Sequence, residues 1–375
     1  MKFPTARTRD AFPIYGQLGI HSGPPAKVFR LPEIALEWPV TVPAGVGPVP
    51  GAGPRADPLS TEAQEGFRFL KDIGRLLEEA TERVRDAVAD GKVATYIPEL
   101  AKADPALVGI AVHTIDGDTH HAGDATVPFT LQSISKVFAL AALMRLTGPA
   151  AALDGMPCEP SGDSFHSIVR LEEESGHPRN PLINAGAILV SSRLPGANRR
   201  EMAGVVEGLL ASVLGASVGV DDQVYASESA TGYRNRALAN YMQHFGLLRN
   251  AERACEAYFT QCALSLDAVG LARAGLFLAN GGSDPISGTR VIDTDSTCSI
   301  LALMAMCGLY DQVGRFALSV GIPAKSAVSG GILAIVPGRM AIATYGPALG
   351  SKGNSVAGMA MLEFLSRELD LSLFR

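Results

Sequence analysis

The sequence predicts an α/β (α+β) protein with one antiparallel sheet and a mostly helical lobe beside it. Short strand pairs with tight turns lie near both ends of the chain, whereas residues from about 140 to 310 carry apolar side chains at helical spacing. The chain has 375 residues, of which 47% are hydrophobic, so it can fill one large domain or two lobes that share a core. We expect the two terminal hairpins to join in one sheet, flanked by the first and last helices, with a site between the lobes.

The first 60 residues differ in composition from the rest of the chain. Residues 39–58 are rich in proline and glycine and show neither helical nor strand periodicity, which is typical of a linker or an extended wrap. The aromatic and aliphatic residues before them leave two alternatives open, namely packing on the main domain or a partly ordered tail. The predicted organisation is an extension of unknown role, 1–60, and a main domain, 61–375, divided into a sheet lobe (about 61–132 and 311–375) and a helical lobe (about 133–310).

The main domain begins with a helix, a hairpin and the start of a second helix. Thr61 and Gln64 form a capping-box pattern, and apolar residues then recur every three or four positions up to Asp90. Residues 107–123, LVGIAVHTIDGDTHHAG, follow as two short strands about an Asp-Gly turn. An apolar helix is predicted to begin near Ser133.

Helices fill the middle of the chain, and a second hairpin precedes the last helix. The segments 198–215, 234–248 and 265–282 each repeat apolar residues at helical spacing, and the last two meet glycine near their ends. Residues 331–347, GILAIVPGRMAIATYGP, form a strand, a Pro-Gly turn and a strand, and residues 354–369 form an amphipathic helix.

Composition and charge exclude several classes of function. The formal net charge of −6 and the lack of a dense basic run argue against nucleic acid as a partner. The five cysteines form no C-x-x-C pair and the seven histidines no H-E-x-x-H motif, so we expect neither a disulfide framework nor a metal site, including at His120-His121. Charged residues interrupt the N-terminus and no apolar stretch reaches ~20 residues, so we expect a cytoplasmic protein without signal peptide or membrane segment.

The segment FTLQSISKVFAL, residues 129–140, places a serine and a lysine in an otherwise apolar run. Ser133 and Lys136 are three positions apart and therefore neighbours on a helix, while Ser135 faces elsewhere and is expected to be structural. Free N–H groups at the helix start suit an oxyanion, and the same field, together with the apolar neighbours, disfavours a charged Lys136. A lysine that is neutral near pH 7 needs a pKa about 3 units below its usual value, or about 4 kcal/mol, and can then take the serine proton.

Neighbouring features favour nucleophilic catalysis over a chance S-x-x-K. Strand, turn and apolar helix in this order match the context of S-x-x-K acyl-transfer enzymes. Residues 322–332, IPAKSAVSGGI, precede the second hairpin, and Lys325-Ser326-Ala327 resembles the K-[ST]-G strand motif of β-lactamase-like folds. A glycine-rich strand edge lets a substrate approach the backbone closely, although the same residues also fit an ordinary strand entry.

Several sequence blocks in the right order resemble the bacterial serine-dependent glutaminases, which share the β-lactamase and penicillin-binding-protein fold. The resemblance runs from about residue 72 to 375. It implies hydrolysis of L-glutamine through a γ-glutamyl-serine intermediate, no metal or organic cofactor, and a homodimer or homotetramer. The matching blocks are GKVATYIPELA, VPFTLQSISKVF, EPSGDSFHSIV, HPRNPLINAGAI, ESATGYRNRALA, YFTQCAL, CGLYDQVGRFA and GIPAKSAVSGGI.

The resemblance also implies a role for each matching residue. The catalytic roles fall to Ser133 as nucleophile, Lys136 as its general base, Tyr310 as a tyrosine over the serine that relays its proton, and Tyr96 near the nucleophile. The substrate-binding roles fall to Asn184, Glu228, Asn235, Tyr258 and Tyr310, with the backbone N–H groups of Ser133 and Val328 as an oxyanion hole.

These residue types fit the chemistry of free glutamine, which carries an ammonium and a carboxylate beside its reactive amide. Glu228 can bind the ammonium, and the neutral donors Asn184 and Asn235 can bind the carboxylate. The amide carbon needs a nucleophile, a base and two N–H donors. Taken singly, an asparagine near a helix start is more often a cap and a helical tyrosine more often a core residue, so the hypothesis rests on the whole set.

Three positions depart from the family pattern. Ala327 stands where glycine is common, Tyr233 where an acidic residue is common, and His166 where asparagine is common. If the backbone at Ala327 needs a positive φ, its methyl group would be strained. The other two departures bear on specificity and rate more than on reaction class.

Two alternative functions remain open on the same fold. A β-lactamase or D-alanyl peptidase relative would share S-x-x-K, but that class normally works outside the cytoplasm. A non-catalytic amino-acid-binding protein would need no nucleophile, and the complete set of Ser133, Lys136 and Tyr310 argues against it.

Overall fold

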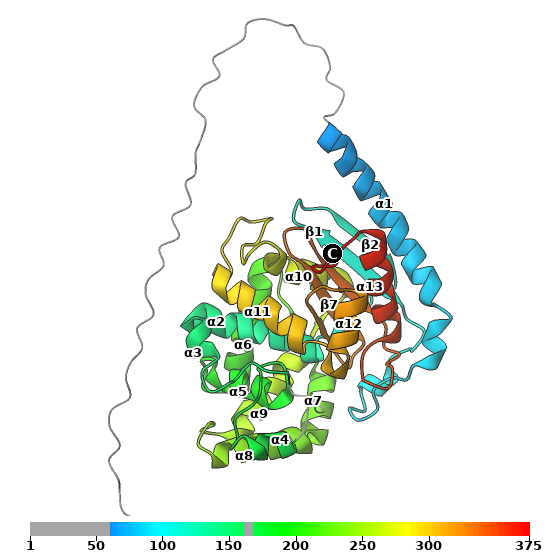
Figure 1. The fold of residues 1–375 in the computed structure, drawn as a ribbon. Helices are drawn as coiled ribbons and strands as arrows, with labels where there is room; N and C mark the ends of the chain where they lie inside the picture. Colours follow the sequence, from blue (N-terminus) through cyan, green and yellow to red (C-terminus); the bar gives the residue numbers. More distant parts are fainter. Residues whose placement is uncertain (1–60, 161–167) are drawn as a thin grey trace, which may run out of the picture. The chain divides into compact units, whose positions relative to one another are not determined.

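The structure of the protein is a computed structural model that describes residues 61–160 and 168–375 (Figure 1). The predicted extension 1–60 lies outside the described residues, as does the segment 161–167 with His166. All helices and strands given below belong to the described part of the chain.

Two hairpins join in one five-stranded antiparallel sheet, as the sequence predicts (Figure 1). The N-terminal hairpin consists of β1 (Gly109–Thr114) and β2 (Thr119–Gly123), and the C-terminal hairpin of β7 (Gly331–Val336) and β8 (Met340–Tyr345). β1 pairs with β8, which gives the strand order β2-β1-β8-β7-β6. The strand β6 (Ala324–Ser326) carries the K-S-A segment, so this motif lies at the end of the sheet beside β7.

The first and last helices of the described chain cover one face of the sheet. These helices are α1 (Thr61–Val84) and α13 (Val356–Glu368), and they also pack on each other. Successive side chains of a strand point to opposite faces. Ile110 of β1 and Ile342 of β8 therefore share a core with Leu77 of α1. This face agrees with the predicted flanking of the sheet by the terminal helices.

The opposite face of the sheet is covered by α10 (Ala268–Ala279), which the sequence reading grouped with the central helices. Small side chains explain this placement, because Ala111 and Ala343 of the strands face the same core as α10. A Cβ atom on Gly275 would lie 2.7 Å from Leu333 Cδ1, so glycine permits the close approach. The helix α10 thus lies against this face of the sheet and also contacts α6.

The other helices form a mostly helical region beside the sheet (Figure 1). Four short 3₁₀ turns connect elements, and one of them, η3 (Gln132–Ile134), leads directly into α2. The helices are α2 (Ser135–Thr147), α3 (Pro149–Ala152), α4 (Ile168–Glu173), α5 (Asn184–Arg193), α6 (Arg199–Leu214), α7 (Asp222–Thr231), α8 (Tyr233–His244), α9 (Ala251–Cys262), α11 (Thr294–Cys307) and α12 (Val313–Ser319).

The helix α2 is the central element of this region. Every side chain from Ser135 to Met144 is buried, and α2 contacts α5, α6 and α11. A small three-stranded sheet that the sequence did not predict holds the segment before it, with the order β3 (Phe129–Thr130), β5 (Leu264–Leu266), β4 (Gly219–Val220). The N–H of Leu131 donates to the carbonyl of Leu264 at 2.7 Å, which fixes the chain just before Ser133.

The five cysteines are free thiols in the structure. Cys255 and Cys262 are buried, and Cys298 is exposed. No single helix among the described residues combines the length and apolar composition needed to cross a membrane; one bent pair, Thr294–Cys307 with Tyr310–Ser319, meets that test by length and composition alone.

Candidate active site

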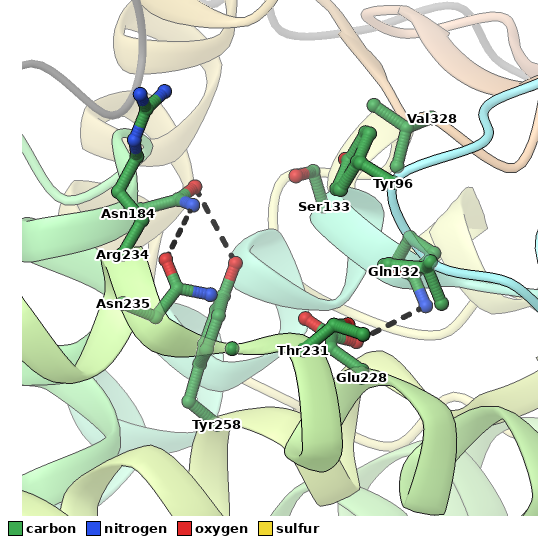
Figure 2. A pocket seen from close by; sticks show the side chains of 12 residues that line it. Tyr96, Gln132, Ser133, Asn184, Glu228, Thr231, Arg234, Asn235, Tyr258 and Val328 are labelled. Atoms are coloured by element: carbon green, nitrogen blue, oxygen red, sulfur yellow. Dashed lines mark hydrogen bonds between the residues drawn. The ribbon is translucent and has the colours of Figure 1, made fainter.

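A cavity of about 350 Å³, here called the site cavity, brings together seven of the nine residues singled out in the sequence (Figure 2). These seven are Tyr96, Ser133, Asn184, Glu228, Asn235, Tyr258 and Val328. The other two, Lys136 and Tyr310, do not line this cavity but interact with residues that do. Figure 2 shows Asn184, Asn235 and Tyr258 on one side of Ser133, with Tyr96 and Val328 on the other.

Ser133 lies in the 3₁₀ turn η3, and the α-helix begins two residues later than the sequence indicated. The turn starts at Gln132, whose φ of +45° is rare for a residue with a side chain. Ser133 is 6% exposed at the cavity wall. Ser135 is fully buried, and its Oγ donates to the carbonyl of Gln132 at 2.7 Å, which gives it the structural role expected from the sequence.

Lys136 is 1% exposed, and its ammonium has two strong acceptors. Lys136 Nζ donates to Asn184 Oδ1 at 2.8 Å and to the carbonyl of Leu182 at 3.1 Å. Among the described residues it makes no hydrogen bond with Ser133 Oγ, so the expected serine–lysine hydrogen bond is replaced by these two. Catalytic hydrogen bonds are often long before substrate binds, so this geometry is compatible with proton transfer.

Burial lowers the pKa of Lys136 to about 8, while the nearby Glu228 and Cys262 act in the opposite direction. Desolvation, which the apolar neighbours of Lys136 in the sequence indicated, is the largest cause of the lowered pKa. With this pKa, about a tenth of the lysine is neutral at pH 7. The pKa falls in the direction that the sequence indicated, and the fraction of neutral Lys136 should grow as the pH rises to 8.

Tyr310 follows a tight turn and interacts with the serine. Its φ of +53° is in the left-handed region, so the surrounding contacts must hold the backbone there. Burial raises the pKa of Tyr310 to about 12, and hydrogen bonds with Ser133 and Ser326 act against this rise. Lys325 Nζ lies 4.6 Å from the centre of the Tyr310 ring and donates to the carbonyls of Gly308 and Ser326.

One side of the cavity is a network of amide and phenol groups. Asn184 begins α5, its Nδ2 donates to Asn235 Oδ1 at 2.8 Å, and Tyr258 OH donates to Asn184 Oδ1 at 3.5 Å. Gly186 packs closely against the turn before Asn184. A Cβ atom on Gly186 would lie 1.9 Å from the carbonyl oxygen of Asn180, so only glycine fits there. These polar groups are suited to a carboxylate ligand, since amide N–H and phenol O–H groups are donors.

Glu228 forms the anionic part of the cavity wall. It is 5% exposed, and its Oε2 accepts a hydrogen bond from Gln132 Nε2 at 3.3 Å. Burial raises its pKa to about 8, while the bond from Gln132 and the charge of Lys136 lower it. A carboxylate desolvated in this way gains most from an incoming cation, such as the ammonium of an amino acid.

Tyr96 and Val328 form the wall opposite the amide network (Figure 2). Tyr96 is 56% exposed, so its ring stands at the opening of the cavity, whereas Val328 is buried. The adjacent Ala327 does not have a positive φ, and the left-handed backbone falls on Gly330 instead, with a φ of +101°. The methyl group of Ala327 is therefore accommodated without the backbone strain considered above.

Several lining residues were not identified from the sequence, namely Ile97, Gln132, Thr231, Gly232 and Arg234. Gln132 is the neighbour of Ser133 in the sequence, and this adjacency was the available signal. The other residues lie within four positions of Tyr96, Glu228 or Asn235 along the chain, but sequence alone does not show which side of a turn faces a cavity.

A polar cluster joins α7, α8 and α9, and we call it the Arg236 cluster. It consists of Tyr225, Ser229, Arg236, Glu252 and Glu256. Arg236 Nη2 forms ion pairs with Glu252 at 2.9 Å and Glu256 at 3.1 Å, and it also donates to Ser229 Oγ. Ser229 Oγ donates in turn to Glu256 at 2.9 Å.

Two members of this cluster are next to expected recognition residues in the chain. Ser229 directly follows Glu228, and Arg236 directly follows Asn235. Arg236 Nη1 also donates to the Ser229 carbonyl, so one guanidinium connects the end of α7 to the start of α8. We therefore expect Arg236 to act as a positioning residue for both cavity side chains.

Replacing Arg236 with glutamine should raise KM for the substrate about tenfold, the equivalent of ~1.4 kcal/mol, and leave kcat within about threefold. The reason is that Glu228 and Asn235 shift while Ser133 and Lys136 stay in place. Steady-state kinetics of Arg236→Gln and Arg236→Lys measure this, and lysine should restore part of the affinity. Arg200→Gln, on an exposed side chain, is the matched control. A fall in kcat as large as the rise in KM would contradict a positioning role.

Comparison with known proteins finds relatives over most of the chain. The family model described as Glutaminase matches residues 91–374. A glutaminase from Agrobacterium fabrum is 46% identical over 308 residues, which is 81% of this chain and 99% of that protein. A glutaminase from Clostridium botulinum is 43% identical over 305 residues, which is 80% of this chain and 100% of that protein.

Solved structures of glutaminases are also similar to this chain. The probable glutaminase from Bacillus subtilis complexed with 6-diazo-5-oxo-L-norleucine is 37% identical with a TM-score of 0.75, over 80% of this chain and 97% of that one. A covalent complex of the Bacillus subtilis glutaminase with 5-oxo-L-norleucine, formed by reaction with 6-diazo-5-oxo-L-norleucine, has a TM-score of 0.74 at 37% identity, over 80% and 99% of the two chains.

Proposed function

Because this chain belongs to the serine-dependent glutaminase family and hydrolyses L-glutamine to L-glutamate and ammonia, we propose that Ser133 performs the reaction through a γ-glutamyl ester. The observation that carries the assignment is the site cavity, which sets Ser133 between a buried carboxylate and a group of neutral donors. The covalent complex of the Bacillus subtilis relative supports a nucleophilic side chain in this family. The alternative functions on the same fold lack comparable support.

Glutamine is bound by its α-amino-acid end. Glu228 binds the ammonium. Burial raises the pKa of Glu228 to about 8, so its carboxyl group is mostly protonated below that pH, and the ion pair with the substrate stabilises the ionised form. The carboxylate of the substrate takes N–H donors from Asn184 and Asn235 and the O–H of Tyr258. The side-chain amide then reaches Ser133 on the far side of the cavity (Figure 2).

The chemistry needs four roles beside binding. Ser133 Oγ attacks the γ-carbonyl carbon while Lys136 accepts its proton, with Tyr310 as the group that relays the proton toward the departing nitrogen. The backbone N–H groups of Ser133 and Val328 receive the oxyanion. The C–N bond breaks, ammonia leaves with the proton, and water then hydrolyses the ester. Tyr96 covers the opening beside the nucleophile.

Replacing Glu228 with glutamine should raise KM for glutamine by roughly 10- to 100-fold, because a charge-assisted contact to the substrate ammonium is lost. Ammonia release at varied glutamine concentration measures this change. Asp222→Asn on the same helix is the matched control, since Asp222 is exposed and outside the cavity. An unchanged KM in Glu228→Gln would show that the ammonium binds elsewhere.

We also propose that the enzyme works in the cytoplasm as a homodimer or homotetramer. The five free thiols support a reducing compartment. Light scattering coupled to gel filtration tests the assembly, and a single species at monomer mass would contradict it.

A further inference from the structure

A cavity of about 160 Å³, here called the arginine pocket, shares no lining residue with the site cavity. Three arginines line it: Arg193 ends α5, Arg249 lies in the connection between α8 and α9, and Arg253 lies in the first turn of α9. None of the described residues that line this pocket is an aspartate or a glutamate. Three positive charges therefore meet in a small space, and the reaction proposed above uses none of them.

Backbone carbonyl groups hold the half-buried Arg193 in a fixed position. Its Nη1 donates to the carbonyl of Ala152 at 3.0 Å, and its Nη2 donates to the carbonyl of Asp154 at 2.7 Å. A guanidinium has five N–H donors, so three of them have no acceptor among the described residues. Burial lowers the pKa of Arg193, while the charge of Asp154 acts in the opposite direction. An arginine held in this way is ready to pair with an anion at little cost in side-chain order.

Arg249 and Arg253 are exposed at the same pocket and carry charges that no carboxylate neutralises. In the part of the chain that the structure describes, neither guanidinium forms an ion pair or a hydrogen bond. Glu252 lies beside Arg253 in the sequence, but both of its carboxylate oxygens accept from Arg236 Nε. Like charges that converge without a counter-charge repel one another, and a bound anion would remove that repulsion.

The start of α9 offers the pocket a neutral side-chain donor in addition. The N–H of Arg253 donates to Asn250 Oδ1 at 2.9 Å, so the amide oxygen of Asn250 is already used and its Nδ2 is left as a donor. Asn250 lines the pocket, together with the apolar side chains of Leu247 and Ala254. The pocket therefore combines charged and neutral donors with a short apolar wall.

From this geometry we infer that the arginine pocket binds a small dicarboxylate that carries no amino group. A guanidinium matches a carboxylate through two parallel hydrogen bonds, and arginines from three segments can serve a carboxylate at each end of the ligand. The apolar wall suits the short carbon chain between the two carboxylates. Free amino acids, including glutamate, fit poorly because their ammonium would find no acidic side chain in the pocket. The inference does not depend on the role of Ser133.

The test is calorimetric binding of glutarate, glutamate and inorganic phosphate to the full-length enzyme. Glutarate is glutamate without its amino group, so the pair isolates the effect of the ammonium. We expect glutarate to bind wild type with a Kd on the order of 1 mM or lower, as two or three charge-assisted contacts imply. The Arg249→Gln/Arg253→Gln double variant should bind glutarate at least about tenfold more weakly. Glutamate can enter the site cavity as the product, so its affinity should be the same in both proteins.

The matched control is the Arg145→Gln/Arg315→Gln double variant, which removes two exposed arginines that do not line the pocket. Ammonia release from glutamine and thermal unfolding without ligand verify that both double variants are folded. Glutarate should raise the Tm of wild type and of the control but not that of Arg249→Gln/Arg253→Gln. Unchanged glutarate affinity in Arg249→Gln/Arg253→Gln, or an equal loss in the control, would overturn the inference. Phosphate binding that needs Arg249 and Arg253, without glutarate binding, would overturn the assignment of a dicarboxylate.

Discussion

Replacing Ser133 with alanine should abolish ammonia release from glutamine, with kcat falling by at least about 10⁴-fold. Alanine leaves no nucleophile at the cavity wall, and Lys136 then has no proton to accept. The assay is glutamate formation under saturating glutamine. Mass spectrometry after treatment with 6-diazo-5-oxo-L-norleucine gives a second measurement, because the wild-type chain should gain a covalent label at Ser133 and the variant should not.

Ser135→Ala is the matched control, since it removes the same hydroxyl two residues away. Ser135 Oγ donates to the Gln132 carbonyl at 2.7 Å, so its loss should cost about 1 kcal/mol of unfolding free energy and change kcat only a few-fold. Thermal unfolding verifies that both variants are folded. Activity above a hundredth of wild type in purified Ser133→Ala, or labelling of that variant at another residue of the cavity, would refute Ser133 as nucleophile.

Replacing Lys136 with arginine should lower kcat by about 10²- to 10⁴-fold, because a guanidinium keeps its proton and cannot act as a base. The positive charge near Glu228 and Asn184 is retained, so glutamine binding should weaken much less than turnover. Kinetics and calorimetric binding of glutamine separate the two effects. Lys102→Arg, on an exposed side chain, is the matched control. Normal turnover in Lys136→Arg would exclude this lysine as the base.

The same lysine should set the pH dependence of the wild-type enzyme. Its folded pKa, about 8, is below that of an ordinary lysine, and only the deprotonated form accepts a proton, so kcat should rise as pH increases from 6 towards 8. Glu228 must be ionised to bind ammonium, and its pKa of about 8 makes kcat/KM rise in the same interval. The two groups interact, so the profile belongs to the pair. A flat profile between pH 6 and 8 would contradict this account.

Local sequence patterns were sufficient for most elements of the fold. The strand alternation around Asp116-Gly117 and Pro337-Gly338 indicated both hairpins, and the structure places them where the sequence did. The small sheet of β3, β5 and β4 was not found, because its strands have only two or three residues and carry no measurable periodicity. The sequence also did not show on which side of the sheet α10 packs, because the apolar pattern of a buried helix does not depend on which element covers it.

For the candidate site, too, the sequence predicted one part and the structure supplied the rest. The spacing of Ser133 and Lys136 and the order of the sequence blocks named the side chains that the structure brings to one cavity and its surroundings. The hydrogen-bond partners of those side chains could be identified only from the structure. Lys136 bonds to Asn184, which is 48 residues away, and Gln132 bonds to Glu228, which is 96 residues away.

By itself, therefore, the sequence determined the two hairpins and the main helices and singled out the residues that we propose to react, because these features are encoded in local periodicity and in short motifs. The tertiary structure alone decided the extent of desolvation at Lys136, the Arg236 cluster that joins α7, α8 and α9, and the shape of the site cavity. The physical reason is that burial, pKa and cavity shape depend on groups distant in the chain, and their mutual distances are fixed only when the helices and the sheet pack together.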